Sequence, residues 1–210
     1  MFDSRLRPLI DPPLRRLALV LAHFRLSANA VTWLGFLLGA AGWLALAFTQ
    51  YPLALACILA NRLCDGLDGA LARVTTLTDL GGYLDIVLDF LFYAGVPFFF
   101  AVGRPADALP AAFLVFSFVG TGSSFLAFAV LAARRGLTTE KHGKKALYYL
   151  GGLTEGTETI ALFVLVCLRP DWFGIAAWIF GGLCWLTTLT RIITAMVTFR
   201  EASPPPESAA

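Results

Sequence analysis

Charged residues are scarce in this sequence. They make up 14% of its 210 residues, whereas 58% are apolar, and the mean hydropathy is +0.75. A typical soluble domain is roughly 45–50% apolar and about 25% charged. The composition therefore excludes an ordinary water-soluble globule, whose surface would be too apolar to stay dispersed, and it excludes a disordered chain. A net charge of +2 is too small to indicate a nucleic-acid partner.

Cysteine and histidine are also scarce. The four cysteines lie in apolar runs without a CxxC pair, as is typical of small buried hydrophobic residues. Neither of the two histidines is placed to favour a zinc site. The first residues include Asp3, Arg5 and Arg7 where a signal peptide would have its apolar core, so the sequence predicts no such peptide.

Long apolar runs, in contrast, are abundant. A membrane helix needs roughly 20 residues, and the runs predict an all-α integral membrane protein with six transmembrane helices. We expect one catalytic membrane domain over residues 1–201, an amphipathic juxtamembrane helix at 13–22, and a disordered tail at 202–210. The six expected spans lie at about 30–48, 52–73, 80–102, 109–132, 147–168 and 173–198.

The distribution of Lys and Arg predicts the orientation. With the N-terminus on the cytoplasmic side, the external loops fall near 49–51, 103–108 and 169–172. These loops hold only Arg104 and Arg169 of the sixteen basic residues. Since cytoplasmic loops carry the excess of basic residues, we expect both termini inside. Ser27 or Asn29 offers an N-cap for the first span.

Four aspartates lie inside the second and third spans, where lipid disfavours charge. Asp65 and Asp68 are three residues apart, and Asp85 and Asp89 are four apart, so each pair shares a helix face. A short turn near 74–79 makes the two helices antiparallel neighbours. At 1.5 Å per residue the four should converge, roughly 10–15 Å inside the cytoplasmic ends. A carboxylate at the bilayer centre costs at least ~2.5–3.5 kcal/mol, so something must offset four of them.

A divalent cation is the expected counter-charge. Carboxylate oxygens suit Mg²⁺ or Mn²⁺, and two such ions form a standard device for phosphoryl transfer. Gly66, Gly69, Gly81 and Gly82 would let a bulky ligand approach the backbone, and Arg73 is placed to pair with a phosphate oxygen. An alternative stays open, in which the aspartates form ion pairs with Arg62 and Arg73.

These residues resemble a known family pattern. Residues 65–73 read DGLDGALAR and residues 81–89 read GGYLDIVLD, which is similar to the D-x2-D-G-x2-A-R and G-x3-D-x3-D blocks of CDP-alcohol phosphotransferases. Eight positions match. Seven residues separate the blocks where the family usually has eight, which leaves the loop's contacts in doubt. Further stretches, at 120–125, 148–158 and 185–191, resemble a bacterial inner-membrane subgroup, the YnjF-like proteins.

The resemblance implies a reaction and its site. A CDP-linked lipid, usually CDP-diacylglycerol, would give its substituted phosphate to a polar alcohol, and CMP would leave. Asp65, Asp68 and Asp85 would hold the first metal, and Asp89 would complete the second site and act as general base. Further implications are a homodimer among membrane lipids, in the inner membrane, with a cytoplasmic active site. The CDP-binding residues would be Asp68, Gly69, Ala72, Arg73 and Gly81.

Polar residues in the cytoplasmic half are candidates for binding the acceptor. A phosphorylated acceptor, such as glycerol 3-phosphate or inositol phosphate, would need basic residues, whereas a neutral or amine-bearing one would suit acidic residues. An alternative is that the acidic residues pair with Arg191 and Lys145 and join the last two spans. The candidates are Arg134, Lys144, Lys145, Glu155, Glu158 and Arg191.

Two other functions remain open at this stage. A membrane prenyltransferase with a metal-bound diphosphate would use Asn61, Asp65, Asp85 and Asp89, but it does not need the Gly69 to Arg73 block. A cation or proton transporter would use the intramembrane aspartates as a pathway, but the outer halves of the spans carry no matching polar groups.

Overall fold

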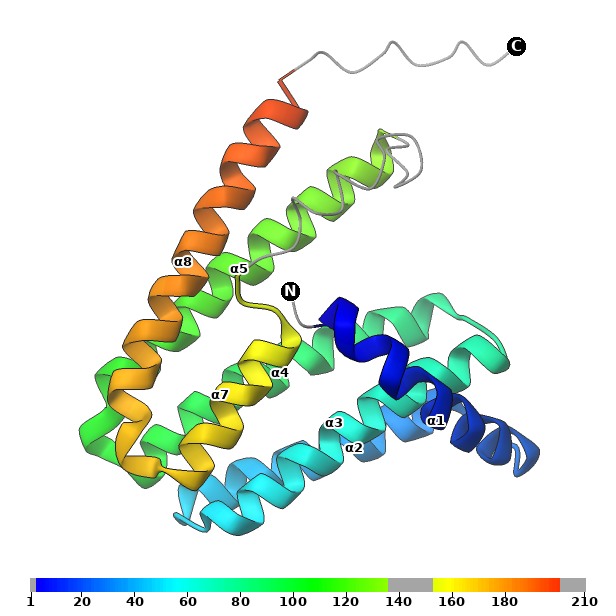
Figure 1. Cartoon of the computed structure of the whole chain (residues 1–210), viewed down its shortest axis with the longest axis horizontal. Helices are drawn as coiled ribbons and strands as arrows, with labels where there is room; N and C mark the ends of the chain where they lie inside the picture. Colours follow the sequence, from blue (N-terminus) through cyan, green and yellow to red (C-terminus); the bar gives the residue numbers. More distant parts are fainter. Residues whose placement is uncertain (1–2, 136–152, 201–210) are drawn as a thin grey trace.

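The computed structural model describes residues 3–135 and 153–200, and within these residues it contains helices and no strand. The all-α prediction is therefore confirmed. Figure 1 shows the helices in chain order. They are α1 (Asp3–His23), α2 (Ala28–Ala47), α3 (Tyr51–Val74), α4 (Asp79–Gly103), η1 (Pro105–Asp107), α5 (Ala108–Arg134), α7 (Gly156–Leu168), η2 (Pro170–Trp172) and α8 (Phe173–Thr198).

Side-chain caps set two helix starts beside the expected site. The Ser27 hydroxyl accepts a hydrogen bond from the Ala30 amide at 3.2 Å, so Ser27 is the N-cap of α2. Thr78 does the same for Gly81 at 3.0 Å, at the start of α4. Each cap satisfies an amide that has no partner within its helix. The turn that separates α3 from α4 is thereby confined to 75–78.

Two expected boundaries need correction. The helix expected at 13–22 is part of a longer α1, which begins at Asp3. The span expected at 147–168 does not begin before Gly156 in the described residues, because 153–155 are not helical. Glu155 is the N-cap there, and its backbone amide donates to the Glu158 side chain at 3.1 Å. Residues 147–152 and the tail at 202–210 lie outside the described part of the chain.

Four segments are long and apolar enough to cross a membrane: α2, α4, residues 105–134 and residues 170–198. The other two expected spans differ from them. Helix α3 is long enough, but it carries Arg62, Asp65, Asp68 and Arg73. Helix α7 has 13 residues, which is about 20 Å at 1.5 Å per residue, less than the ~30 Å of a hydrocarbon core. Several helices therefore span the membrane, while the count of six stays a prediction.

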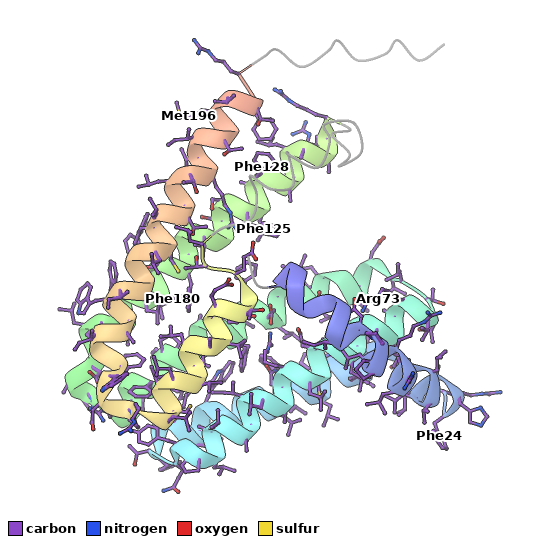
Figure 2. All side chains as sticks on the ribbon, viewed as in Figure 1. Phe24, Arg73, Phe125, Phe128, Phe180 and Met196 are labelled. Carbon is purple, nitrogen blue, oxygen red and sulfur yellow. The ribbon has the colours of Figure 1, made fainter. Side chains whose placement is uncertain are left out.

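The helices form two connected groups (Figure 1). Helices α2, α3 and α4 pack together, with α1 lying across α3, and α5 runs alongside α8. Helix α4 also packs on α5, and α7 packs on α3. A core of aromatic residues joins the groups, in which Phe100 of α4 stacks on Phe173 of α8 at 4.0 Å between ring centroids. At the far end of the α5–α8 pair, Phe128 packs against Phe199 (Figure 2).

Two glycines let α2 approach its neighbours. A Cβ added at Gly35 would lie 2.8 Å from Cys64 Cβ of α3, and one at Gly39 would lie 2.8 Å from the Phe92 ring of α4. Real Cβ atoms essentially never come so close, so any side chain at these positions would push the helices apart. The small residues at this interface thus place α3 and α4 against α2.

Arg104 joins two loops at the end of the helices that lies opposite the turn between α3 and α4. Its Nε lies 2.9 Å from Asp107 Oδ2 and its Nη1 lies 2.8 Å from Asp171 Oδ1. Arg104 thereby links the turn after α4 to the turn after α7. The hydrogen bond to Asp171 is the main reason that the pKa of Arg104 is raised above its usual value.

Candidate active site

The four aspartates line one narrow pocket between α2, α3 and α4. The pocket has a volume of about 10 Å³, on the order of the space for one water molecule. Asp65 and Asp68 come from one face of α3, and Asp85 and Asp89 from one face of α4. The convergence expected from the helical spacing is therefore present. The pocket is completed by Thr32, Gly35 and Phe36 of α2, Asn61 and Arg62 of α3, and Leu88 of α4.

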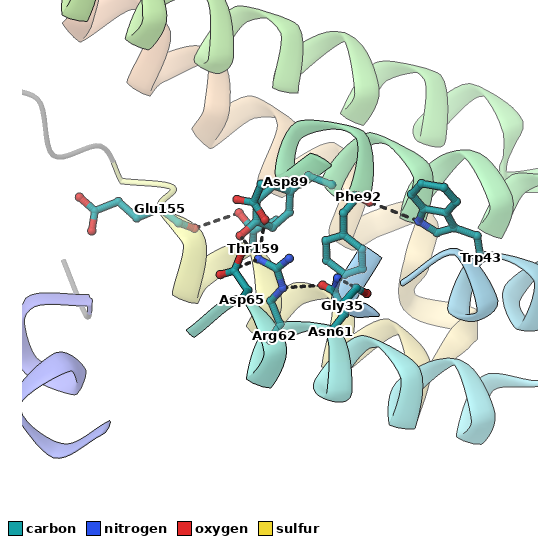
Figure 3. A network of polar contacts seen from close by, with 10 residues as sticks. Gly35, Trp43, Asn61, Arg62, Asp65, Asp89, Phe92, Glu155 and Thr159 are labelled. Carbon is teal, nitrogen blue, oxygen red and sulfur yellow. Dashed lines mark hydrogen bonds and ion pairs between the residues drawn. The ribbon is translucent and has the colours of Figure 1, made fainter. Parts of the chain in front are cut away.

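Arg62 is the cation in this pocket. Its Nη1 lies 2.6 Å from Asp89 Oδ1 and 3.6 Å from Asp65 Oδ2, so one guanidinium bridges α3 and α4 (Figure 3). The ion-pair alternative is thus realised for Arg62. It is not realised for Arg73, which forms no ion pair with another residue of the described chain. Arg73 lies in the last turn of α3 (Figure 2).

Several contacts fix the Arg62 side chain. Its Nε donates to Asn61 Oδ1 at 2.8 Å, and Asn61 Nδ2 donates to the Gly35 carbonyl of α2 at 2.8 Å. Nη1 also donates to the Tyr93 hydroxyl at 3.1 Å. The guanidinium carbon lies 4.4 Å from the centre of the Phe92 ring and 5.2 Å from that of Tyr93, distances at which aromatic faces stabilise a cation.

The four carboxylates are chemically suited to a divalent metal, but in this structure they lie too far apart to share one ion. Asp68 is 5% exposed, and neither Asp68 nor Asp85 has an ion-pair partner within the described residues. Four carboxylates and one guanidinium leave three negative charges, a set that hard cations suit. Within residues 3–135 and 153–200, however, no three His, Cys, Asp or Glu side chains lie close enough to hold one ion. Arg62, between Asp65 and Asp89, occupies part of that space.

The remaining expected CDP-binding residues lie outside the pocket lining. Gly69 and Ala72 follow Asp68 along α3, and a Cβ at Gly69 would lie 3.4 Å from Arg73 Nη1. Gly81 lies at the start of α4, where a Cβ would lie 3.1 Å from Asn29 Oδ1 of α2. The two helix starts are therefore close together. These residues lie along the last part of α3 and at the start of α4, and they do not line the narrow pocket itself.

A second, larger cavity lies beside the first. Its volume is about 180 Å³, and Glu155 and Arg191 both line it. Arg191 Nη1 donates to the Thr121 carbonyl at 2.9 Å, and its guanidinium lies over the Phe125 ring. The rest of the lining consists of Phe90, Tyr93, Phe118, Gly122, Thr154, Gly156 and Thr159.

Two of the other acceptor candidates, Glu158 and Arg134, do not line this cavity. Glu158 serves in the cap of α7, and Arg134 lines neither cavity. Lys144 and Lys145 lie outside the described residues. Sequence reasoning did not single out Tyr93, which lines the larger cavity and accepts a hydrogen bond from Arg62 of the narrow pocket. Its spacing of four residues from Asp89 places it on the same helical face, and that signal could have identified it.

The described residues thus define a class: an all-helical membrane protein with a carboxylate pocket between α2, α3 and α4. A family model described as CDP-alcohol phosphatidyltransferase matches residues 25–190. The chain belongs to the CDP-alcohol phosphatidyltransferase family, and it is accordingly a transferase of phospholipid biosynthesis.

Individual relatives agree with this assignment. The chain is 53% identical over 202 residues to the inner membrane protein YnjF of Escherichia coli, covering 96% of this chain and 98% of that protein. It is 34% identical over 101 residues to an archaetidylinositol phosphate synthase of Pyrococcus horikoshii, covering 48% and 54%.

A solved structure shares the fold. It is the phosphatidylinositol phosphate synthase of Mycobacterium tuberculosis with CDP-DAG bound, which matches with a TM-score of 0.63 and 20% identity. The match covers 94% of this chain and 98% of that one.

Proposed function

We propose that this protein transfers a phosphatidyl group from a CDP-linked lipid, with CDP-diacylglycerol as the donor, to a polyol phosphate, releasing CMP. The observation that carries the proposal is the convergence of the four family aspartates on one pocket, with a larger cavity that contains Glu155 and Arg191 next to it. The donor is supported by the family and by the ligand named for the mycobacterial structure. A prenyltransferase or a transporter has no comparable support.

Asp89 is the proposed catalytic residue. Its carboxylate lines the narrow pocket and would take a proton from the acceptor hydroxyl, as a general base does. The acceptor oxygen then attacks the lipid-side phosphorus, and the bond to the CMP oxygen breaks. CMP carries away the electron pair of that bond.

Asp65, Asp68, Asp85 and Asp89 are the proposed holders of two Mg²⁺ or Mn²⁺ ions. When bound, such ions would supply charge stabilisation on the diphosphate. This assignment of metal ligands is supported by the burial of Asp68. It is also supported by the three negative charges that remain when the charge of Arg62 is subtracted. Gly69, Ala72, Arg73 and Gly81 are the proposed contacts of the cytidine and diphosphate, since they follow Asp68 along α3 or lie at the start of α4.

The second cavity is the proposed acceptor site. Arg191 would bind the acceptor's phosphate by charge-assisted hydrogen bonds, and the polar groups of Thr121, Thr154 and Glu155 would bind its hydroxyls. The names of two similar proteins, an archaetidylinositol phosphate synthase and a phosphatidylinositol phosphate synthase, support a phosphorylated polyol over a neutral one. The Tyr93 side chain connects this cavity to Arg62 and Asp89.

Location and assembly complete the proposal. The distribution of Lys and Arg predicts which side of the protein is cytoplasmic. On that side lie the ends of α3 and α8 and the starts of α4 and α7, and the site is near them. We therefore infer cytoplasmic termini, a cytoplasmic active site and six spans in a bacterial inner membrane, supported by the relative of that name. A homodimer, which the family resemblance implies, is testable by cross-linking in membranes.

A CMP-release assay tests the function. The detergent-purified protein is given CDP-diacylglycerol, Mg²⁺ or Mn²⁺, and one acceptor at a time: inositol phosphate, glycerol 3-phosphate, inositol, glycerol or serine. We expect CMP release with a phosphorylated polyol and none with the neutral acceptors. Release only with a neutral acceptor would overturn the acceptor assignment. Pyrophosphate release from a prenyl diphosphate, with no CMP from any mixture, would overturn the reaction class.

A further inference from the structure

Arg62 has a role that the family pattern does not assign. It lies outside the eight matching positions, yet it contacts two of the four aspartates. A guanidinium placed inside an apolar span is costly, and its contacts with Asp65 and Asp89 are those that a divalent cation would make. The position of the charge therefore coincides with that of the expected metal.

The structure holds Arg62 in this position from three helices. Asn61 links its Nε to the Gly35 carbonyl of α2, Asp89 accepts its Nη1 from α4, and the rings of Phe92 and Tyr93 flank the guanidinium. Each contact restricts a side chain that would otherwise be flexible. A residue fixed so well keeps the two carboxylates paired when no other cation is present.

A divalent ion and Arg62 cannot both occupy the space between these carboxylates without repulsion. Like charges a few ångströms apart in a low-dielectric interior repel strongly. We propose that Arg62 is a resident counter-ion that gives up its contacts with Asp89 and Asp65 when a divalent metal binds, so that it lowers metal affinity while stabilising the metal-free protein. This inference rests on the proposed metal-dependent transfer.

This exchange of Arg62 for a metal accounts for the distances between the carboxylates in the pocket. With Arg62 in place, no three carboxylates of the described residues lie close enough for one ion. Removal of the guanidinium would leave Asp65 and Asp89 to approach a shared cation. Arg62 is accordingly a positioning residue, since it acts through Asp89 and does not itself reach the reacting atoms.

Mn²⁺ binding to the purified protein tests the exchange, with the free ion measured by electron paramagnetic resonance. Arg62→Gln keeps an amide for Asn61 but removes the charge. We expect its Kd for Mn²⁺ to be at least about fivefold lower than that of the wild type, within the usual range for two linked binding events. Arg104→Gln is the matched control, because Arg104 also bridges two aspartates but outside the pocket. It should bind Mn²⁺ as the wild type does.

Thermal unfolding with and without Mn²⁺ gives a second readout. If Arg62 were merely structural, its replacement would lower the melting temperature equally in both conditions. Arg62→Gln should unfold at a lower temperature than the wild type without metal, and saturating Mn²⁺ should close that gap. A gap that persists in Mn²⁺, or an unchanged or weaker Mn²⁺ affinity, would overturn the exchange and leave the metal site standing. Absence of Mn²⁺ binding in the wild type and both variants would overturn the metal site and the exchange together.

A milder substitution covers a failure of Arg62→Gln to fold. Arg62→Lys keeps the positive charge but loses the Nε contact with Asn61, so the cation is held less firmly. Tighter Mn²⁺ binding than in the wild type would support the exchange, and equal or weaker binding would overturn it.

Discussion

The hydroxyl of Tyr93 lies 3.1 Å from Nη1 of Arg62, and this hydrogen bond joins the carboxylate pocket to the larger cavity beside it. Arg62 lines the carboxylate pocket and Tyr93 lines the larger cavity. Asp89, one turn before Tyr93 on α4, accepts from the same Nη1. The proposed general base is therefore held at the boundary where donor and acceptor have to meet.

Asp89→Asn should abolish turnover without unfolding the protein. The amide cannot take a proton from the acceptor, and loss of a general base costs about 10²–10⁴-fold. Its oxygen can still accept from Arg62, so the bridge between α3 and α4 is kept. CMP release and the melting temperature report the two effects. Asp107→Asn, at the opposite end of the molecule, is the control, and normal turnover by Asp89→Asn would refute the assigned role.

Chelation should stop the reaction. The acidic pocket keeps three negative charges after Arg62 is counted, and in the proposed reaction a divalent ion at these carboxylates would stabilise charge on the diphosphate. EDTA should reduce CMP release to background, and excess Mg²⁺ or Mn²⁺ should restore it. Unchanged activity after exhaustive chelation would exclude a metal requirement.

Gly39→Leu should destabilise the protein through the contact of α2 with Phe92. A Cβ at this position already lies 2.8 Å from the Phe92 ring, and overpacking of this kind costs typically about 1–3 kcal/mol. The melting temperature in detergent measures the effect. Gly182→Ala is a matched control, because a Cβ there meets nothing within 4 Å. Equal stability of the two variants would contradict the close approach of α2 and α4.

Arg191→Gln should weaken acceptor binding and leave the chemical step largely intact. A hydrogen bond to a charged group contributes about 1.5–3 kcal/mol, so KM for the phosphorylated acceptor should rise at least about tenfold, with a smaller change in kcat. Arg169→Gln, which lines neither cavity, should behave as the wild type. A fall in kcat at constant KM would place Arg191 outside the acceptor site.

Arg104→Gln should have a small and pH-independent effect on stability. The ion pair is largely exposed at Asp171, and such pairs contribute about 0.2–1 kcal/mol. Because the pKa of Arg104 is raised, its contribution is present below its unfolded pKa and is lost only as pH rises through the higher folded value. The difference in melting temperature should therefore stay constant from about pH 6 to pH 9. A difference that disappears within this range would contradict the assignment.

The helix ends and the aspartates followed from local signals in the sequence. Ser27 was one of two possible caps, and the spacing of Asp65, Asp68, Asp85 and Asp89 placed them on facing helices. These features depend on helical periodicity and on residues close in the chain, which a sequence displays directly. The start of α7 is harder to predict, because the apolar run continues upstream of Gly156. The helix nevertheless begins at Gly156, directly after its N-cap Glu155.

Relationships between distant residues were harder to predict. The bridge from Arg62 to Asp89 spans 27 residues, and that from Arg191 to the Thr121 carbonyl spans 70. Each depends on how helices are rotated and packed, which hydrophobic periodicity leaves open. The choice between a metal and an arginine as counter-charge could not be made from spacing, because Arg62 and Asp65 would share a helix face in either case.

The late start of α7 places non-helical backbone against α8. Because the helix begins only at Gly156, residues 153–155 bring non-helical backbone to the wall of the larger cavity, where their polar groups need partners. Thr187 of α8 supplies them, since its hydroxyl accepts from the Leu153 amide and shares a hydrogen bond with Thr154. Thr154 and Thr187 are only 8% and 1% exposed, so α8, and not water, satisfies the backbone at the start of α7.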